Sequence, residues 1–185
     1  MSLEQSTIVK NTQKYFKTAT DKGFMNDELM AFLGESFIKA PASTNTDMNN
    51  AFEGGLVAHL LLTTSYAVST NNSLPEAKRV DTDSLIKVCL LHQIGKTFLF
   101  VPQTSSWHNE RGIMYTFNND QVSMRVGERS LYIATKFGIK FTEEEYAAIN
   151  SFDKVDDKMA EYHNTRLGEI LKVSNKLAII DEQGK

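Results

Sequence analysis

VCLLHQIGK, residues Val88–Lys96, combines the pattern of a buried helix with a histidine at the end of that pattern. Asp81 and Asp83 precede it, where acidic residues favour the start of a helix. The apolar stripe that follows has helical spacing and comprises Leu85, Val88, Cys89, His92, Lys96 and Leu99. A helix with this stripe turns His92 toward the protein interior.

A second histidine, His59, lies on a similar stripe in the segment FEGGLVAHLLLTTSYAV, together with Leu56, Leu60, Thr63 and Ala67. The two histidines are 33 positions apart (92 − 59), far enough to lie on neighbouring antiparallel helices and meet in space. Their chemistry leaves two interpretations open. Such a pair can bind a metal or act in catalysis, but a buried histidine is more commonly hydrogen-bonded to a backbone group.

Helical patterns cover most of the remaining chain. Gly23 is expected to end the first helix, Asn26 to cap the second, and Thr142 with Glu145 to form a capping box. The inward face of the first helix is expected to carry Ile8, Val9, Phe16 and Ala19. The other expected helices cover residues 26–40, 52–68, 122–138, 142–152 and about 157–180.

Two segments depart from the helical pattern. SSWHNERGIMYTF alternates apolar residues on either side of NERG, which predicts a short β-hairpin over residues 105–117. PASTNTDMNN, residues 41–50, is polar and rich in turn-forming residues, which predicts a linker. We therefore expect an all-α fold with one hairpin, in which an N-terminal helical pair (1–40) packs on a helical domain (49–180) to form one compact domain.

Bulk properties limit the classes of function. With 185 residues, 41 % of them hydrophobic, the chain can bury one substantial core. The net charge of −3 does not favour nucleic-acid binding. Cys89 is the single cysteine and is expected to be a buried apolar residue in a reduced, cytoplasmic protein. No apolar run is long enough to span a membrane, so no membrane partner is expected.

Three segments in order, NNAFEGGLVAHLLLTTSYA, VCLLHQIGK and VGERSLYIATKF, resemble the HD-domain metal-dependent phosphohydrolases, in particular small bacterial and phage proteins. The resemblance spans about residues 49–180. It implies an HD-domain-like helical bundle in which histidines and aspartates of the central helices hold one or two divalent ions. Those ions would activate a water molecule for phosphoester or nucleotide hydrolysis.

The chain departs from this family pattern at most ligand positions. His59 and His92 match two family histidines, but Gln93 stands in the place of the aspartate that follows the second one. Val126 and Phe152 replace two further histidines, although Gly127, Glu128 and Ser130 are retained. Asn175 aligns with the final aspartate. A shifted alignment could supply the carboxylate of Asp153, which would otherwise lie in a solvated acidic turn.

These replacements predict the loss of the metal site. Gln93 and Asn175 offer neutral amides, and Val126 and Phe152 offer no lone pair, so His59 and His92 remain as weak candidate ligands. No cofactor is expected, and a divalent metal only if the chain is an atypical phosphohydrolase. A second alternative is a remnant cleft that binds a nucleotide or phosphate through His59, His92, Gln93, Lys96 and Arg125.

The expected function is therefore a binding or structural one, exerted by a catalytically inactive HD-fold protein. A protein partner or a homo-oligomer is expected. If the chain is encoded by a phage, an assembly or interaction component in the host cytoplasm or virion would fit the resemblance. Lys96 can alternatively extend from a helix end to solvent, and Arg125 can be an ordinary exposed arginine.

Overall fold

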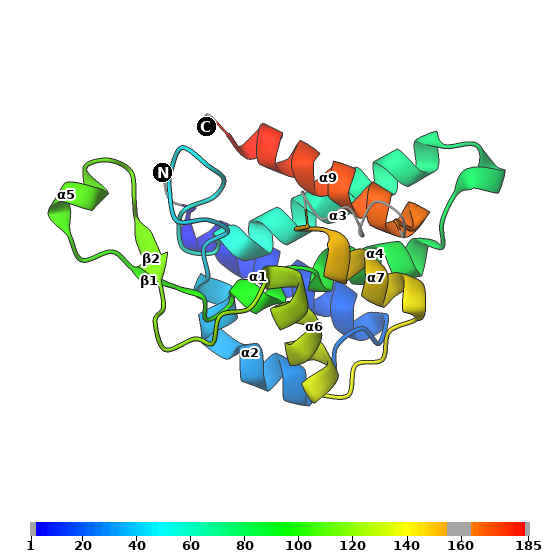
Figure 1. The fold of residues 1–185 in the computed structure, drawn as a ribbon, viewed down its shortest axis with the longest axis horizontal. Helices are drawn as coiled ribbons and strands as arrows, with labels where there is room; N and C mark the ends of the chain where they lie inside the picture. The colour runs from blue at the N-terminus through cyan, green and yellow to red at the C-terminus, as the bar shows by residue number, and fades with distance from the viewer. Residues whose placement is uncertain (1–2, 155–163, 184–185) are drawn as a thin grey trace.

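The computed structural model describes residues 3–154 and 164–183 and is mostly helical, with one two-stranded antiparallel hairpin, as predicted (Figure 1). The α-helices are α1 (Gln5–Asp21), α2 (Asp27–Lys39), α3 (Gly55–Ser73), α4 (Thr82–Leu91), α5 (Ser106–Asn109), α6 (Val126–Lys136), α7 (Glu143–Ser151) and α9 (Arg166–Glu182). The short 3₁₀ helices are η1 (Glu76–Lys78) and η2 (Ile94–Lys96), and the strands are β1 (Phe100–Pro102) and β2 (Tyr115–Phe117).

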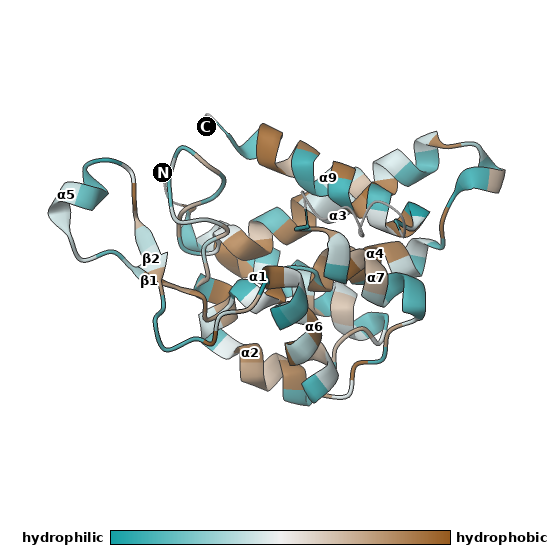
Figure 2. Ribbon diagram, viewed as in Figure 1, coloured by the Kyte–Doolittle hydropathy of each residue, from teal (hydrophilic) through white to brown (hydrophobic). Residues whose placement is uncertain are grey.

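One hydrophobic core joins the helices of the bundle. Helix α3 packs against both α4 and α9, and residues of α1, α2, α6 and α7 contribute to the same buried cluster. The hydrophobic part of the ribbon gathers around α4 in the middle of the view (Figure 2). Tyr15 of α1 is fully buried and donates to the carbonyl oxygen of Leu90 at 2.8 Å, which ties α1 to α4. Over residues 3–154 and 164–183, no helix is both long and apolar enough to span a membrane.

Several helix ends are confirmed. The Asn26 side chain accepts a hydrogen bond from the backbone N–H of Leu29, and Thr142 with Glu145 forms the capping box. Gly23 follows α1 with a φ of 69°, the left-handed conformation expected of a C-terminal glycine. The face of α1 differs in part from the prediction. Tyr15 is buried with Ile8 and Ala19, whereas Val9 is 45 % exposed because it is turned away from the Ile8 stripe.

The hairpin is confirmed, but its first strand lies earlier in the chain than predicted. β1 pairs antiparallel with β2 and places Phe100 opposite Phe117. The residues around Trp107 form α5 within the long connection, and the Arg111 guanidinium lies 3.7 Å from the centre of the Trp107 ring. We call the segment 100–117 the arm, because it projects from the bundle (Figure 1). The connection between β1 and β2 spans residues 103–114, which is too long for a tight turn centred on NERG. It contains the short helix α5 instead.

The polar segment 41–50 is not a free linker. Ala42 and Asn49 are buried, and the Ser43 hydroxyl donates to the Asn49 carbonyl oxygen at 2.6 Å. The Ala42 N–H also donates to the Asn50 carbonyl oxygen, at 3.0 Å. The segment therefore forms a loop closed by its own hydrogen bonds, and this loop fixes Asn49 and Asn50 against the end of α9.

The final helix is shifted relative to the prediction. Helix α9 begins at Arg166 and continues to Glu182, two residues beyond the predicted end at residue 180. The predicted residues 157–163 lie outside the described part of the chain. The extension matters because it brings the carboxylate of Glu182 to the two asparagines of the 41–50 loop.

Candidate functional site

The two histidines do meet inside the bundle. His59 lies on α3, and His92 follows the last residue of α4, where its backbone N–H still bonds to Val88. Their ring centres are 6.5 Å apart, and both side chains are fully buried. Gln93 follows His92 at the start of η2 and is also buried. The structure thus brings together three of the five residues predicted for the cleft.

Asn175 of α9 completes this group, which we call the central cluster: His59, His92, Gln93 and Asn175. The Asn175 Oδ1 atom lies 2.8 Å from His59 Nε2 and 3.3 Å from His92 Nε2. It also accepts a hydrogen bond from Gln93 Nε2 at 2.9 Å. The Asn175 amide therefore occupies the point on which the two imidazoles converge.

The surroundings of His92 determine both its charge and which ring nitrogen carries the proton. Its Nδ1–H donates to the carbonyl oxygen of Cys89 at 2.8 Å, in the preceding turn of α4. Burial, with smaller contributions from His59 and Lys96, lowers the pKa of His92 to about 3. His92 is neutral at physiological pH, and because its proton is on Nδ1, its Nε2 carries a lone pair directed at Asn175.

This tautomer bears on the orientation of the amides. A lone pair on His92 Nε2 cannot bond to the amide oxygen of Asn175, since both are acceptors. Gln93 Oε1 is buried and has no hydrogen-bond partner. An Asn175 amide turned by 180° would present its NH₂ group to His92, and a turned Gln93 would present Oε1 to the same NH₂ group. With both amides turned and His59 unprotonated, the cluster carries no charge.

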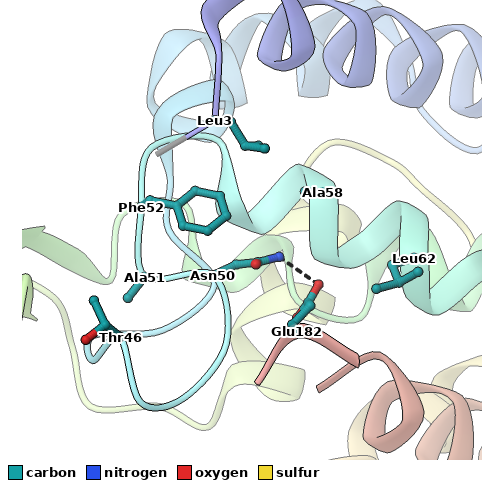
Figure 3. Close-up of a pocket in the computed structure, with 8 residues that line it drawn as sticks. All are labelled: Leu3, Thr46, Asn50, Ala51, Phe52, Ala58, Leu62 and Glu182. Carbon is teal, nitrogen blue, oxygen red and sulfur yellow. Dashed lines mark hydrogen bonds between the residues drawn. The ribbon is translucent and has the colours of Figure 1, made fainter. Parts of the chain in front are cut away.

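Glu182 is a member of the site that the sequence prediction missed. His59 Nδ1 donates to its Oε2 atom at 2.8 Å, and Asn49 Nδ2 donates to the same atom at 3.1 Å. Asn50 Nδ2 donates to Oε1 at 2.7 Å (Figure 3). A signal existed in the sequence, because Glu182 follows Asn175 by seven residues and hence lies on the same helix face two turns later.

Val126 and Phe152, which the resemblance aligns with two family histidines, lie in packed surroundings. The ring of Phe152 meets the ring of His92 edge-on, with centres 4.7 Å apart. Val126 is half-buried at the start of α6. The Ser130 hydroxyl donates to the His92 carbonyl oxygen at 2.8 Å and accepts from the Gly95 N–H at 2.9 Å. A Cβ atom on Gly95 would lie 2.8 Å from the Val126 carbonyl oxygen, so this close approach of η2 to α6 requires glycine.

Lys96 bonds to the 41–50 loop and not to the central cluster. Its ammonium group donates to the Ala42 carbonyl oxygen at 2.6 Å, and its pKa is lowered to about 8 by burial, against the attraction of Glu182 and Asp153. It therefore does not extend into solvent as a helix-end lysine would. It fastens the 41–50 loop to η2.

Arg125 is also separate from the histidines. It is exposed at the start of α6 and lines a surface pocket of about 480 Å³ with Arg129 and Asp153. Arg129, by contrast, is 8 % exposed and donates to Gln121 Oε1 at 2.9 Å. The structure therefore does not assemble the single cleft that the sequence predicted from His59, His92, Gln93, Lys96 and Arg125.

The shifted alignment also fails to supply a metal ligand. Asp153 Oδ2 accepts a hydrogen bond from the Gly127 N–H at 3.2 Å, so this carboxylate caps the start of α6. No hydrogen bond links it to a histidine in the described residues. Asp153 is half-buried and Oδ1 is a buried atom without a partner, so a solvated turn does not describe it either.

A divalent ion does not fit the donors of the central cluster. The described residues contain no group of three or more His, Cys, Asp or Glu side chains arranged to hold a metal. The four side chains that converge are two imidazoles and two amides, all of them neutral when His59 is unprotonated, and the Glu182 carboxylate bonds the far side of His59. Hard divalent ions prefer several oxygen ligands that include carboxylates.

A comparison of the chain with protein-family models, with curated proteins and with solved structures found no match.

Proposed function

We propose that this chain is a catalytically inactive HD-fold protein that acts through binding, and that its central cluster stabilises the bundle. The observation that carries the proposal is the position of the Asn175 side-chain amide at the point where the two histidine Nε2 atoms converge, with the Gln93 amide next to it. This arrangement supports the family resemblance, because the positions that would hold an ion converge. It also supports inactivity, because no carboxylate is among them.

Metal-assisted hydrolysis requires an ion that lowers the pKa of a bound water and a group that takes up its proton. The Asn175 and Gln93 amides can do neither at neutral pH. The Phe152 ring packs edge-on against the His92 ring. The side chains at the positions that would bind an ion instead contact one another.

The nucleotide- or phosphate-binding alternative receives less support. It requires Lys96 and Arg125 to face the same space as the histidines. Lys96 instead bonds to Ala42, and Arg125 lines a separate pocket on the surface. His59 and His92 are fully buried, so neither can reach a ligand without an opening of the helices.

A variant that restores the carboxylates tests this proposal. Gln93→Asp combined with Asn175→Asp places two anions beside His59 and His92, and we expect this double variant to gain saturable Mn²⁺ binding in a calorimetric titration. We expect the wild type to show none. Gln13→Glu with Asn72→Asp adds the same charge at exposed positions and is the matched control. Wild-type protein that is purified with close to one tightly held metal ion per chain would overturn the proposal.

The binding role calls for its own measurement. Trp107, Phe117 and Val122 are each more than half exposed, on or next to the arm, and exposed apolar groups of this kind are typical of interaction surfaces. The native mass of the purified chain distinguishes a homo-oligomer from a monomer that requires a different partner. A monomer that also captures no protein through an immobilised wild-type chain, relative to a Trp107→Ser chain, would contradict a binding role of the arm.

A further inference from the structure

A cavity of about 300 Å³ lies between the start of the chain, the 41–50 loop, α3 and the end of α9 (Figure 3). It is distinct from the central cluster, since none of His59, His92, Gln93 and Asn175 lines it. Glu182 connects the two, because its carboxylate accepts a hydrogen bond from His59 of the cluster and also lines the cavity. The volume is at the lower end of the range of small-molecule sites, about 300 to 1,000 Å³.

The walls of this cavity are mainly apolar. Leu3, Phe52, Ala58 and Leu62 supply hydrocarbon and one aromatic ring. Figure 3 shows Leu3 and the Phe52 ring above Asn50, which is bonded to Glu182, and Leu62 farther along α3. The cavity therefore combines an apolar volume with one carboxylate.

Glu182 is held firmly at this place. Its side chain is 4 % exposed, and its two oxygens accept three hydrogen bonds, from His59, Asn49 and Asn50. Oε1 accepts only one of the three, from Asn50, so it keeps capacity for a further donor. No lysine or arginine of the described residues forms an ion pair with it; the nearby Lys96 ammonium bonds the Ala42 carbonyl instead.

A buried carboxylate with spare acceptor capacity, beside an aromatic ring and apolar walls, matches one class of ligand. An ammonium group can donate to the carboxylate in a charge-assisted hydrogen bond and can also interact with the face of an aromatic ring. An apolar chain attached to it would be buried along α3. A carboxylate or phosphate would meet repulsion at the same place.

We propose that this cavity binds a primary ammonium compound with a short apolar chain, which donates to Glu182 Oε1 and lies against Phe52, Ala58 and Leu62. This inference goes beyond the stabilising role of the central cluster and does not depend on whether the cluster binds a metal. The bound ammonium would also offset the buried negative charge of Glu182.

The test uses hexylamine at pH 7, where it is protonated, titrated into the full chain and followed by NMR. We expect saturable shifts of resonances from the cavity residues. Hexan-1-ol has the same apolar chain but no charge, and we expect it to bind at least about tenfold more weakly, since a charge-assisted hydrogen bond contributes more than a neutral one. Hexanoate is expected not to bind.

Two variants locate the site. Glu182→Gln should weaken hexylamine binding by about tenfold or more, whereas Glu169→Gln, on the exposed face of the same helix, should leave it unchanged. Because Glu182→Gln can also loosen the bundle, Ala58→Leu provides a second variant that fills the cavity and keeps the carboxylate. It should abolish binding in a folded protein. Absence of saturable binding to the wild type, equal binding of hexan-1-ol, or full affinity in Ala58→Leu would overturn the proposal.

Discussion

His59 and His92 are equally buried, yet their surroundings differ in kind. The Nδ1 atom of His92 donates to a backbone carbonyl, and its ring packs against Phe152. The Nδ1 atom of His59 donates to the carboxylate of Glu182, which two asparagines also bind. The His92 side of the cluster is therefore neutral and closed by hydrocarbon, whereas the His59 side retains a charge and borders a cavity.

The two histidines are therefore stabilised in different ways. A backbone carbonyl stabilises a neutral imidazole at little electrostatic cost, so the His92 side needs only good packing. A buried carboxylate requires donors to compensate for its lost hydration, and the 41–50 loop supplies two of them. We expect mutations on the two sides to differ accordingly.

The largest effect is expected on the charged side. Glu182→Ala would leave N–H donors of His59, Asn49 and Asn50 without their shared acceptor, and we expect it to lower the free energy of unfolding by about 3 kcal/mol. Urea unfolding followed by circular dichroism measures this quantity. Glu169→Ala on the exposed face of α9 is the control and should change it by less than about 0.5 kcal/mol. Equal effects of the two substitutions would show that Glu182 does not organise this side.

The neutral His92 side should make the stability of the protein depend on pH. The pKa of His92 is about 3 in the folded protein, below its ordinary value of 6.5, so the unfolded chain binds the proton first as the pH falls. Stability from this group is fully present above pH 6.5 and is lost between pH 6.5 and about 3. From pH 6.5 to 5 the loss amounts to about 2 kcal/mol.

His92→Gln removes this titration. The difference in the free energy of unfolding between wild type and variant should therefore become smaller by about 2 kcal/mol from pH 6.5 to 5. Urea unfolding at both pH values checks it. A constant difference between the two proteins would mean that His92 is protonated within the folded bundle and that this side is not neutral.

The smallest effect is expected where only packing is changed. Phe152→Leu keeps an apolar group against His92 but loses the edge-on ring contact, and we expect a loss of about 1 kcal/mol, measured by thermal or urea unfolding. Tyr146→Leu, on the exposed face of α7, is a matched aromatic control. A loss near 3 kcal/mol would place Phe152 on a par with Glu182 and remove the distinction between the two sides.

The sequence predicted the parts of this site that depend on helical periodicity. The stripes that carry His59 and His92 are buried as expected, because apolar spacing determines which face of a helix turns inward. The alignment of Asn175 with the final family aspartate came from the resemblance. The spacing of residues alone did not predict the short contacts of its amide.

Three features escaped prediction because they depend on tertiary contacts. The 41–50 segment is polar in composition, yet it is buried through its own hydrogen bonds and through Lys96. Glu182 lies two residues beyond the predicted end of its helix, so its seven-residue spacing from Asn175 was not used to include it. The first strand of the hairpin is too short for alternation to be recognised, and pairing with Tyr115–Phe117 defines it.

The most direct test of a stabilising, metal-free cluster is the free energy of unfolding of the wild type, measured by urea in EDTA and again in millimolar Mn²⁺ or Zn²⁺. An ion that binds only the folded chain raises this energy by about 2.7 kcal/mol at one hundred times its dissociation constant. We predict equal values in all three solutions. A rise of that size with either metal, abolished in His59→Gln, would contradict the account.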